Sequence, residues 1–300
     1  MVDLKIELPD DFFKGEERCG YFVSSEMKKV WAVELDLLLE FNRVCKELNL
    51  TYFLDSGTLL GAVRENGFIP WDDDIDVVML RKDYDILCDQ GNRYFSAPYF
   101  FQCAKTDVKY FRGHAQLRNS YTTAILKNEG KMVPFNQGIF IDIFVLDGLI
   151  DDDDLLKQQI DEMNKISIVL RKISIVYSEK NLKRILKKIR SFILEKKYGS
   201  FKDLYSMYEL VAKRYSASSY CDKLMFRKSI KKVKKLKKSW FSKAEYIEFE
   251  GFLFPVPNEY DNILRAYFGD SYMVPQQVST MHGDVVWDVE CPYYEVLKKL

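Results

Sequence analysis

The sequence predicts an α+β fold, in which a mixed β-sheet is flanked by helices and followed by a largely helical second half. Short runs of β-branched and aromatic residues, bounded by turn residues, gather between residues 51 and 147, which is typical of strands. Apolar residues spaced three to four apart precede this region and recur from about residue 151 to residue 239, which is typical of amphipathic helices. We therefore expect one central sheet at 51–147.

The predicted elements follow in a simple order. A long amphipathic helix is expected from about Ser25 to Leu48, because Ser24 or Ser25 can cap its first turn. A strand at 51–54, a glycine turn and a short helix ending near Arg64 come next. Further elements are strands at Ile75–Leu80, Tyr99–Ala104, Ala115–Arg118, Thr122–Leu126 and Gly138–Asp147, and a last helix near Asn258–Phe268.

Composition and charge exclude several classes of protein. The chain has 300 residues, 47% of them hydrophobic and 30% charged, with 14 Gly and 8 Pro, which excludes collagen-like and wholly disordered chains. Its 45 basic and 45 acidic side chains cancel, which argues against a surface built to coat nucleic acid. Any electrostatic function must therefore be local.

Cysteine spacing and hydropathy predict a cytoplasmic protein. The six cysteines form no Cys-x-x-Cys pair, which favours reduced thiols over a zinc cage or a redox dithiol. The first ten residues alternate charged and apolar side chains and lack the apolar core of a signal peptide. No run approaches the ~18 apolar residues of a membrane span. We expect the chain in the cytoplasm, either free or at the inner face of the membrane.

Positive charge is concentrated in a single region of the chain. Residues 180–238 hold 20 Lys or Arg and 4 Asp or Glu, so their net charge is +16 and that of the other residues is −16. A helical stripe within this region is apolar and is formed by Leu182, Ile185, Leu186, Ile189, Phe192 and Ile193. Such a helix fits the surface of an anionic membrane. In the commoner arrangement, the stripe packs into the core and the lysines face water.

Paired acids predict a metal site. Asp74 and Asp76 are two residues apart, so on a strand both side chains leave the same face. Two carboxylates this close repel each other unless a cation or a proton lies between them. A hard divalent ion, Mg²⁺ or Mn²⁺, is the natural partner of such oxygens, and a phosphate usually completes its shell.

The surrounding residues supply complementary groups. Gly57 lets a ligand approach the backbone, and the amides that open the next helix at Thr58 can bind an anion. Arg64, about two turns later, can hold a phosphate oxygen. Asp142 is the lone acid of a second apolar strand and becomes a third metal ligand if the two strands are neighbours.

Simpler interpretations exist for some of these acids. Asp72 and Asp73 can be a solvated turn or a helix cap, and so can the acids at 151–154. This interpretation is weaker for Asp76 and Asp142, because an unpaired carboxylate inside an apolar strand is costly.

The segment from 52 to 85 resembles the signature of the LicD family of phosphorylcholine transferases. The resemblance rests on two motifs, Ser-Gly-Thr-Leu-Leu-Gly-Ala-Val-Arg at 56–64 and Pro-Trp-Asp-Asp-Asp-Ile-Asp at 70–76. The resemblance continues through 138–147 and, more loosely, through 255–257 and 267–275, where Phe268 stands in a motif that usually reads Tyr-Gly. Distant relatives of this family include the fukutin-type ribitol-phosphate transferases. The resemblance implies a nucleotidyltransferase-like fold of the polymerase-β palm type.

The resemblance also implies roles for single residues and for three segments of the chain. Metal binding and catalysis fall on Asp74, Asp76 and Asp142, with Arg64 also catalytic, and donor binding falls on Ser56, Gly57, Thr58, Arg64 and Asp72. Residues 1–150 would form the catalytic core and 151–240 a basic helical region. Residues 241–300 would pack back on the core and complete the acceptor site.

The implied reaction is a Mg²⁺-dependent transfer of a phospho-alcohol group to a hydroxyl of a cell-surface glycan, such as a lipopolysaccharide, teichoic acid or capsule precursor, with release of CMP. Phosphorylcholine from CDP-choline is the first choice of donor, and CDP-glycerol or CDP-ribitol is the alternative. A true nucleotidyltransferase would use the same metal ligands. A protein of another class, a basic module that binds nucleic acid or an acidic partner through 180–238, also stays open, although the preferred function needs no nucleic acid.

Overall fold

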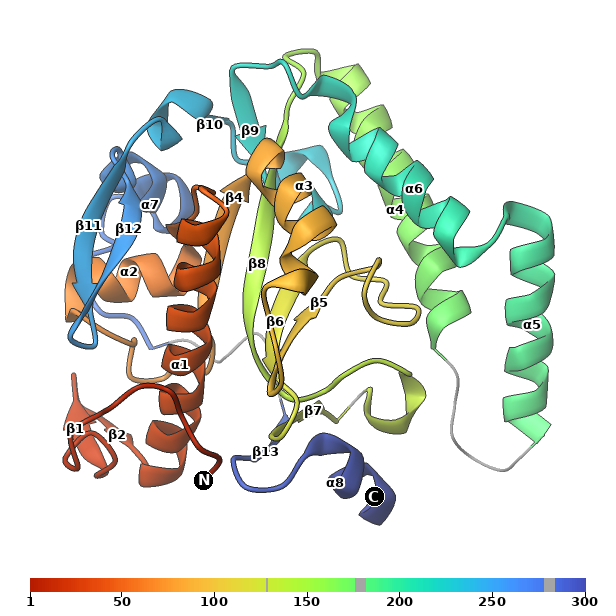
Figure 1. Ribbon diagram of the computed structural model, residues 1–300. Coiled ribbons are helices and arrows are strands. Elements are labelled where there is room, and N and C mark those ends of the chain that lie inside the picture. Colours follow the sequence, from red (N-terminus) through yellow and green to blue (C-terminus); the bar gives the residue numbers. More distant parts are fainter. Residues whose placement is uncertain (128, 176–181, 278–283) are drawn as a thin grey trace.

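The computed structural model describes residues 1–127, 129–175, 182–277 and 284–300 (Figure 1). A seven-stranded mixed sheet forms the centre of the fold, which confirms the predicted α+β class. Its strands are β3 (Phe53–Leu54), β4 (Asp76–Leu80), β5 (Tyr99–Gln102), β6 (Ala115–Asn119), β8 (Ile139–Gly148), β9 (Tyr220–Asp222) and β10 (Leu236–Lys237).

Strand β8 organises this sheet. All ten of its residues are buried, as expected for an apolar run covered on both faces. It lies parallel to β4 on one side. On the other side its first half pairs antiparallel with β6 and its last two residues pair with β9. Asp142, near its middle, is opposite Asp76 on β4 and Gln116 on β6.

Three helices of the first half pack on the sheet or lead into its strands. They are α1 (Ser25–Glu47), α2 (Ser56–Glu65) and α3 (Arg81–Gln90). The predicted first helix is confirmed, and its N-cap is Ser24, whose side chain accepts a hydrogen bond from the amide of Met27. Trp31 and Phe41 of α1 are fully buried in the main core. A short hairpin of β1 (Glu16–Arg18) and β2 (Tyr21–Val23) precedes α1.

The second half begins with three helices on one side of the molecule, of which α5 lies at the outer edge (Figure 1). They are α4 (Asp153–Ser174), α5 (Leu182–Tyr198) and α6 (Phe201–Ala212). Buried residues of α4 and α6, such as Leu156 and Leu204, form a second core that is separate from the main one.

The C-terminal segment returns to the first half. Its elements are β11 (Ala244–Phe249), β12 (Phe252–Pro257), α7 (Tyr260–Phe268), β13 (Val285–Asp288) and α8 (Tyr293–Lys299). Strand β12 lies against β3, and α7 lies against α2. Single 3₁₀ turns occur at Gly91–Arg93, Gly130–Met132, Lys213–Tyr215, Leu224–Phe226, Ile230–Lys232 and Lys238–Phe241.

Two details of the predicted sheet are wrong. Strand β7 (Thr123–Leu126) has the expected position in the chain, but it pairs with β13 in a separate two-stranded sheet. The helical pattern ends at Ala212 rather than near 239, because β9 and β10 extend the central sheet beyond residue 147. Within the described ranges, no helix combines the length and the apolar character needed to cross a bilayer.

Candidate active site

Three carboxylates converge at the centre of the sheet. One oxygen each of Asp74, Asp76 and Asp142 lies within 4.8 Å of the others. The register explains this arrangement, because Asp76 opens β4 directly opposite Asp142 on β8, and Asp74 precedes Asp76 by two residues. A second group of oxygens within the same distance is formed by Asp72, Asp73 and Asp74. The structure thus brings together the acids that the sequence singled out.

The electrostatics of these acids favour a bound cation. Burial, and next the neighbouring carboxylate of Asp76, raises the pKa of Asp74 well above its usual value. Burial, and next Asp142, raises the pKa of Asp76 in the same way. In addition, Oδ1 of Asp76 is buried, and no donor among the described residues bonds it. An all-oxygen donor set with a buried oxygen that lacks a partner fits Mg²⁺ or Mn²⁺.

A polar network on β6 orients Asp142. Gln116 Nε2 donates to Asp142 Oδ1 at 2.6 Å, and His114 Nε2 lies 3.1 Å from the same oxygen. Arg118 in turn donates to Gln116 Oε1 at 2.6 Å and to the carbonyl of Gly138 at 2.6 Å. Burial lowers the pKa of Arg118 to about 10. Sequence reasoning missed this network, although the alternation of His114, Gln116 and Arg118 places all three on one face of the predicted strand.

Hydrogen bonds join the glycine turn to the start of β4. Thr58 Oγ1 accepts a hydrogen bond from the amide of Asp76 at 2.8 Å, and the amide of Asp55 donates to the carbonyl of Asp76 at 3.0 Å. Ser56 adopts a left-handed φ of 50°. A Cβ at Gly57 would lie 2.4 Å from Oδ2 of Asp72, so only glycine lets this carboxylate approach the turn. The donor-binding roles of these residues stay predictions.

Lys223 is a site residue that the sequence did not reveal. Its Nζ bonds the carboxylate of Asp55 and donates to Ser56 Oγ at 2.6 Å. The side chain is buried and lies over the rings of Phe144 and Tyr267, at 4.9 and 4.8 Å from their centroids. Lys223 is one of 20 basic residues in its region. Only the pairing of β9 with β8 brings it to the turn, and no sequence signal indicates that pairing.

The hydrogen bonds of Arg64 within the described residues go to groups other than the three acids. Its Nε donates to Glu65 Oε1 at 2.7 Å, and its Nη1 donates to the carbonyl of Tyr272 at 3.0 Å. The side chain is 7% exposed. In this arrangement Arg64 links α2 to the C-terminal segment, and its contact with a donor phosphate stays a prediction.

A buried acid on α1 lies near the loop that holds Asp72 and Asp73, which precedes β4. Both carboxylate oxygens of Glu34, on α1, are buried and find no hydrogen-bond partner in the part of the chain that the structure describes. Burial, and next the charge of Asp73, raises the pKa of Glu34 well above its usual value. One turn earlier, Trp31 Nε1 donates to the carbonyl of Asp72 at 3.1 Å, so this face of α1 supports the loop. The signal in the sequence was an acid on the apolar face of the predicted helix.

Aromatic rings adjoin Asp142 through His114. The ring of Phe144 lies 5.0 Å from that of His114 and 4.9 Å from that of Phe226, measured between centroids. Phe226 is 44% exposed, so this group of rings reaches the surface. The aromatic content of 15% could not single out these rings.

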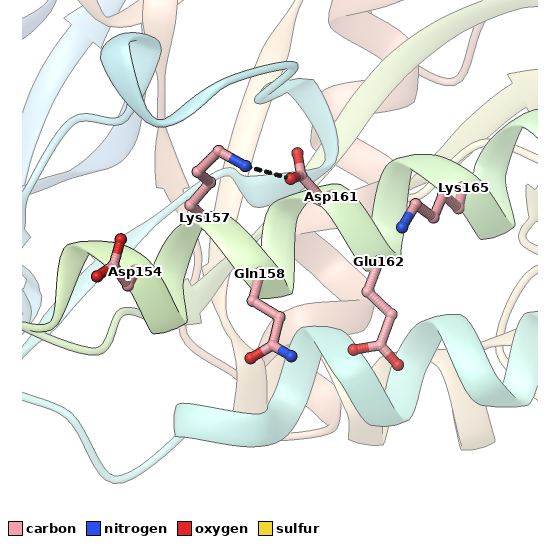
Figure 2. Close-up of a pocket in the computed structure, with 6 residues that line it drawn as sticks. All are labelled: Asp154, Lys157, Gln158, Asp161, Glu162 and Lys165. Carbon is pink, nitrogen blue, oxygen red and sulfur yellow. Dashed lines mark hydrogen bonds and ion pairs between the residues drawn. The ribbon is translucent and has the colours of Figure 1, made fainter.

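A charged surface recess on α4 is a weaker candidate. Figure 2 shows the six side chains that line it, which are Asp154, Lys157, Gln158, Asp161, Glu162 and Lys165. Lys157 Nζ pairs with Asp161 Oδ2 at 2.7 Å. All six residues lie on one solvent-facing helix side, and none of the sheet acids lines the recess. It is a solvated helix face.

Comparisons with known proteins agree with the geometry. Residues 49–140 match the family described as LicD/FKTN/FKRP, nucleotidyltransferase domain. The lipopolysaccharide cholinephosphotransferase LicD of Haemophilus influenzae is 28% identical over 247 residues, which cover 81% of this chain and 90% of that protein. An uncharacterized protein of Caenorhabditis elegans is 31% identical over 104 residues, covering 35% of this chain and 24% of that protein. The matched domain at 49–140 and the alignment over 81% of the chain support a phosphotransferase that carries a LicD-type nucleotidyltransferase domain.

Proposed function

We propose that the protein is a Mg²⁺-dependent phosphotransferase that moves phosphorylcholine from CDP-choline to a hydroxyl of a cell-surface glycan and releases CMP. The observation that carries the proposal is the convergence of Asp74, Asp76 and Asp142, together with the buried Asp76 Oδ1, which has no hydrogen-bond partner among the described residues. The relative from Haemophilus influenzae is a lipopolysaccharide cholinephosphotransferase, which supports this choice of group and acceptor.

Each acid has a role in this proposal. Asp74, Asp76 and Asp142 would hold Mg²⁺, or Mn²⁺ in its place. The chemistry that a bound ion supplies at such a site is neutralisation of phosphate charge. Asp142, held in place by Gln116, accepts the proton of the acceptor hydroxyl. The acceptor oxygen then forms a bond to the phosphorus nearer choline while the bond from that phosphorus to the bridging oxygen breaks, and CMP leaves with the electron pair.

The rings beside the acids favour choline over a polyol. A quaternary ammonium group binds aromatic faces, whereas glycerol or ribitol needs hydrogen-bond partners. Phe226 offers an exposed ring next to Phe144 and His114. CDP-glycerol and CDP-ribitol are therefore the second choice of donor. A cytoplasmic site of reaction is included in the proposal, because all six cysteines, which lie in the described residues, are free.

A panel of labelled donors tests the reaction. Purified protein is incubated with Mg²⁺, a glycan acceptor and CDP-choline, CDP-glycerol, CDP-ribitol or plain nucleoside triphosphates. We expect label from the choline phosphate on the acceptor and CMP in solution, and neither in EDTA. Transfer of a nucleoside monophosphate to the acceptor would instead make the protein a true nucleotidyltransferase. If only glycerol phosphate or ribitol phosphate is transferred, the proposed type of reaction is correct, but CDP-glycerol or CDP-ribitol is the donor instead of CDP-choline.

Stability without metal should fall as the pH rises. The raised pKa values of Asp74 and Asp76 mean that the folded protein binds more protons than the unfolded chain above about pH 4. This excess stabilises the fold at low pH and is lost as the pH rises through the folded pKa values. Mg²⁺ replaces these protons, so it should raise the melting temperature more at about pH 8 than at about pH 5.

Thermal unfolding in EDTA and in Mg²⁺ across this pH range measures the effect. In Asp76→Asn, both the melting temperature in EDTA and the increase caused by Mg²⁺ should vary less with pH. Asp153→Asn, at a side chain that is 77% exposed, should leave both pH dependences unchanged. An equal Mg²⁺ shift at every pH would contradict the proposed ligands.

A further inference from the structure

Helix α5 has an apolar face that the described residues do not cover. Five large side chains on it are between 49% and 65% exposed, namely Ile185, Leu186, Ile189, Phe192 and Ile193. For these five residues, the commoner arrangement expected from the sequence, in which the stripe packs into the core, is therefore wrong; the side chain of Leu182, the sixth member, lies outside the described part of the chain. An uncovered face of this size is the usual mark of an interaction surface.

The helix is attached to the body by its opposite edge. Ser191 is buried, and its hydroxyl donates to the carbonyl of Ile173 on α4 at 3.2 Å. Leu194 packs against the second core. At about 100° per residue, Ile189 lies about 160° around the helix from Ser191. The apolar face thus points away from the protein, and Figure 1 shows α5 at the outer edge of the molecule.

Basic side chains flank this face. Lys188 lies on one side of it, and Arg190 and Lys197 lie on the other, all three exposed. Across the described ranges, no ion pair occupies any of these three side chains. The single acid of α5, Glu195, pairs with Lys109 at 3.1 Å. The helix therefore presents an apolar centre between cations whose charge no described carboxylate balances.

From this arrangement we infer that α5 docks the protein on the surface of an anionic lipid bilayer. The apolar side chains enter the boundary between headgroups and acyl chains, while the flanking lysines and arginine contact lipid phosphates. A second copy of this chain fits less well, because the same face would bring like charges together. Nucleic acid would use the cations but leave the apolar centre in water. The inference does not depend on the proposed reaction.

Flotation of the full chain with lipid vesicles tests the inference. We expect the protein to float with vesicles that contain phosphatidylglycerol and to remain in solution with phosphatidylcholine alone. Replacing Ile189 and Phe192 together by Glu should abolish flotation. The matched control is Leu253→Glu on β12, which is 65% exposed and should float like the original chain.

A charge variant tests the electrostatic contribution. Replacing Lys188, Arg190 and Lys197 together by Gln should weaken binding by about 100-fold, at about tenfold or less for each basic side chain. Failure to float with anionic vesicles, equal flotation with neutral vesicles, or flotation that survives the Ile189/Phe192 change would overturn the inference. So would a dimer, detected by light scattering, that this change dissolves. Because flotation needs no turnover, failure here leaves the proposed reaction untouched.

Discussion

Replacing Asp76 with Asn should abolish turnover and leave the fold intact. Asp76 contributes a buried oxygen that no described residue bonds, and it lies directly opposite Asp142. Electrostatic stabilisation at a metal site contributes several kcal/mol to a phosphoryl transfer, so we expect a loss of about a thousand-fold in kcat. CMP release from CDP-choline measures the rate.

The same variant should not be less stable in the absence of metal. Asn at this position removes one of the repelling charges that raise the pKa of Asp74, so its melting temperature in EDTA should equal or exceed that of the original protein. Titration calorimetry should show weakened Mg²⁺ binding. As a matched control, Asp151→Asn changes a side chain that is 80% exposed and should retain full activity. A folded Asp76→Asn protein with near-normal turnover would remove Asp76 from the proposed site.

Replacing Lys223 with Met should destabilise the fold by about 3–5 kcal/mol, the range measured when one partner of a buried ion pair is removed. The reason is that Asp55, which is 1% exposed, would lose the cation of its ion pair and keep only the hydroxyl of Ser56 as a side-chain partner. Urea unfolding measures the loss. Lys228→Met, at an exposed lysine in the same basic region, is the control and should change stability little.

A double variant separates stability from function at this position. Combining Lys223→Met with Asp55→Asn removes both charges, so most of the lost stability should return. Turnover should be low in the single and in the double variant, because Lys223 no longer holds the turn at Ser56 in its observed position. Full recovery of activity in the double variant would give Lys223 a purely structural role. A single variant as stable as the original protein would contradict the buried pair.

The sequence indicated the centre of this site for a physical reason. An acid inside an apolar strand is costly to bury, so the sequence alone distinguishes Asp76 and Asp142 from the other acids. From the sequence, Asp142 joins the other acids only if the two strands are neighbours, and the register meets this condition by placing Asp76 and Asp142 side by side. The long helix was equally predictable, since Ser24 and the apolar period of its residues agree.

The sequence could not indicate which strands and side chains pair with each other when they are far apart along the chain. Thr123–Leu126 has the pattern of a strand, but a strand pattern does not say which strand it pairs with, and its partner begins at Val285. Lys223 reaches Asp55 across 168 positions. The difference between Lys223 and its many lysine neighbours is its location in space, which local pattern cannot encode.

Strands β8 and β9 have a consequence for how this protein can vary. Gly148 at the end of β8 pairs with Cys221, and the amide of Leu149 donates to the carbonyl of Tyr220 at 2.9 Å. The largely helical segment between β8 and β9 leaves the sheet after Gly148 and rejoins it at Tyr220, so its two ends adjoin. Because its two ends adjoin, we expect changes on its outer surface to leave the geometry of the acids intact, whereas its contacts with the first half, such as Glu209 with Arg81, have to be kept. Evolution can thus alter where such an enzyme works independently of what it catalyses.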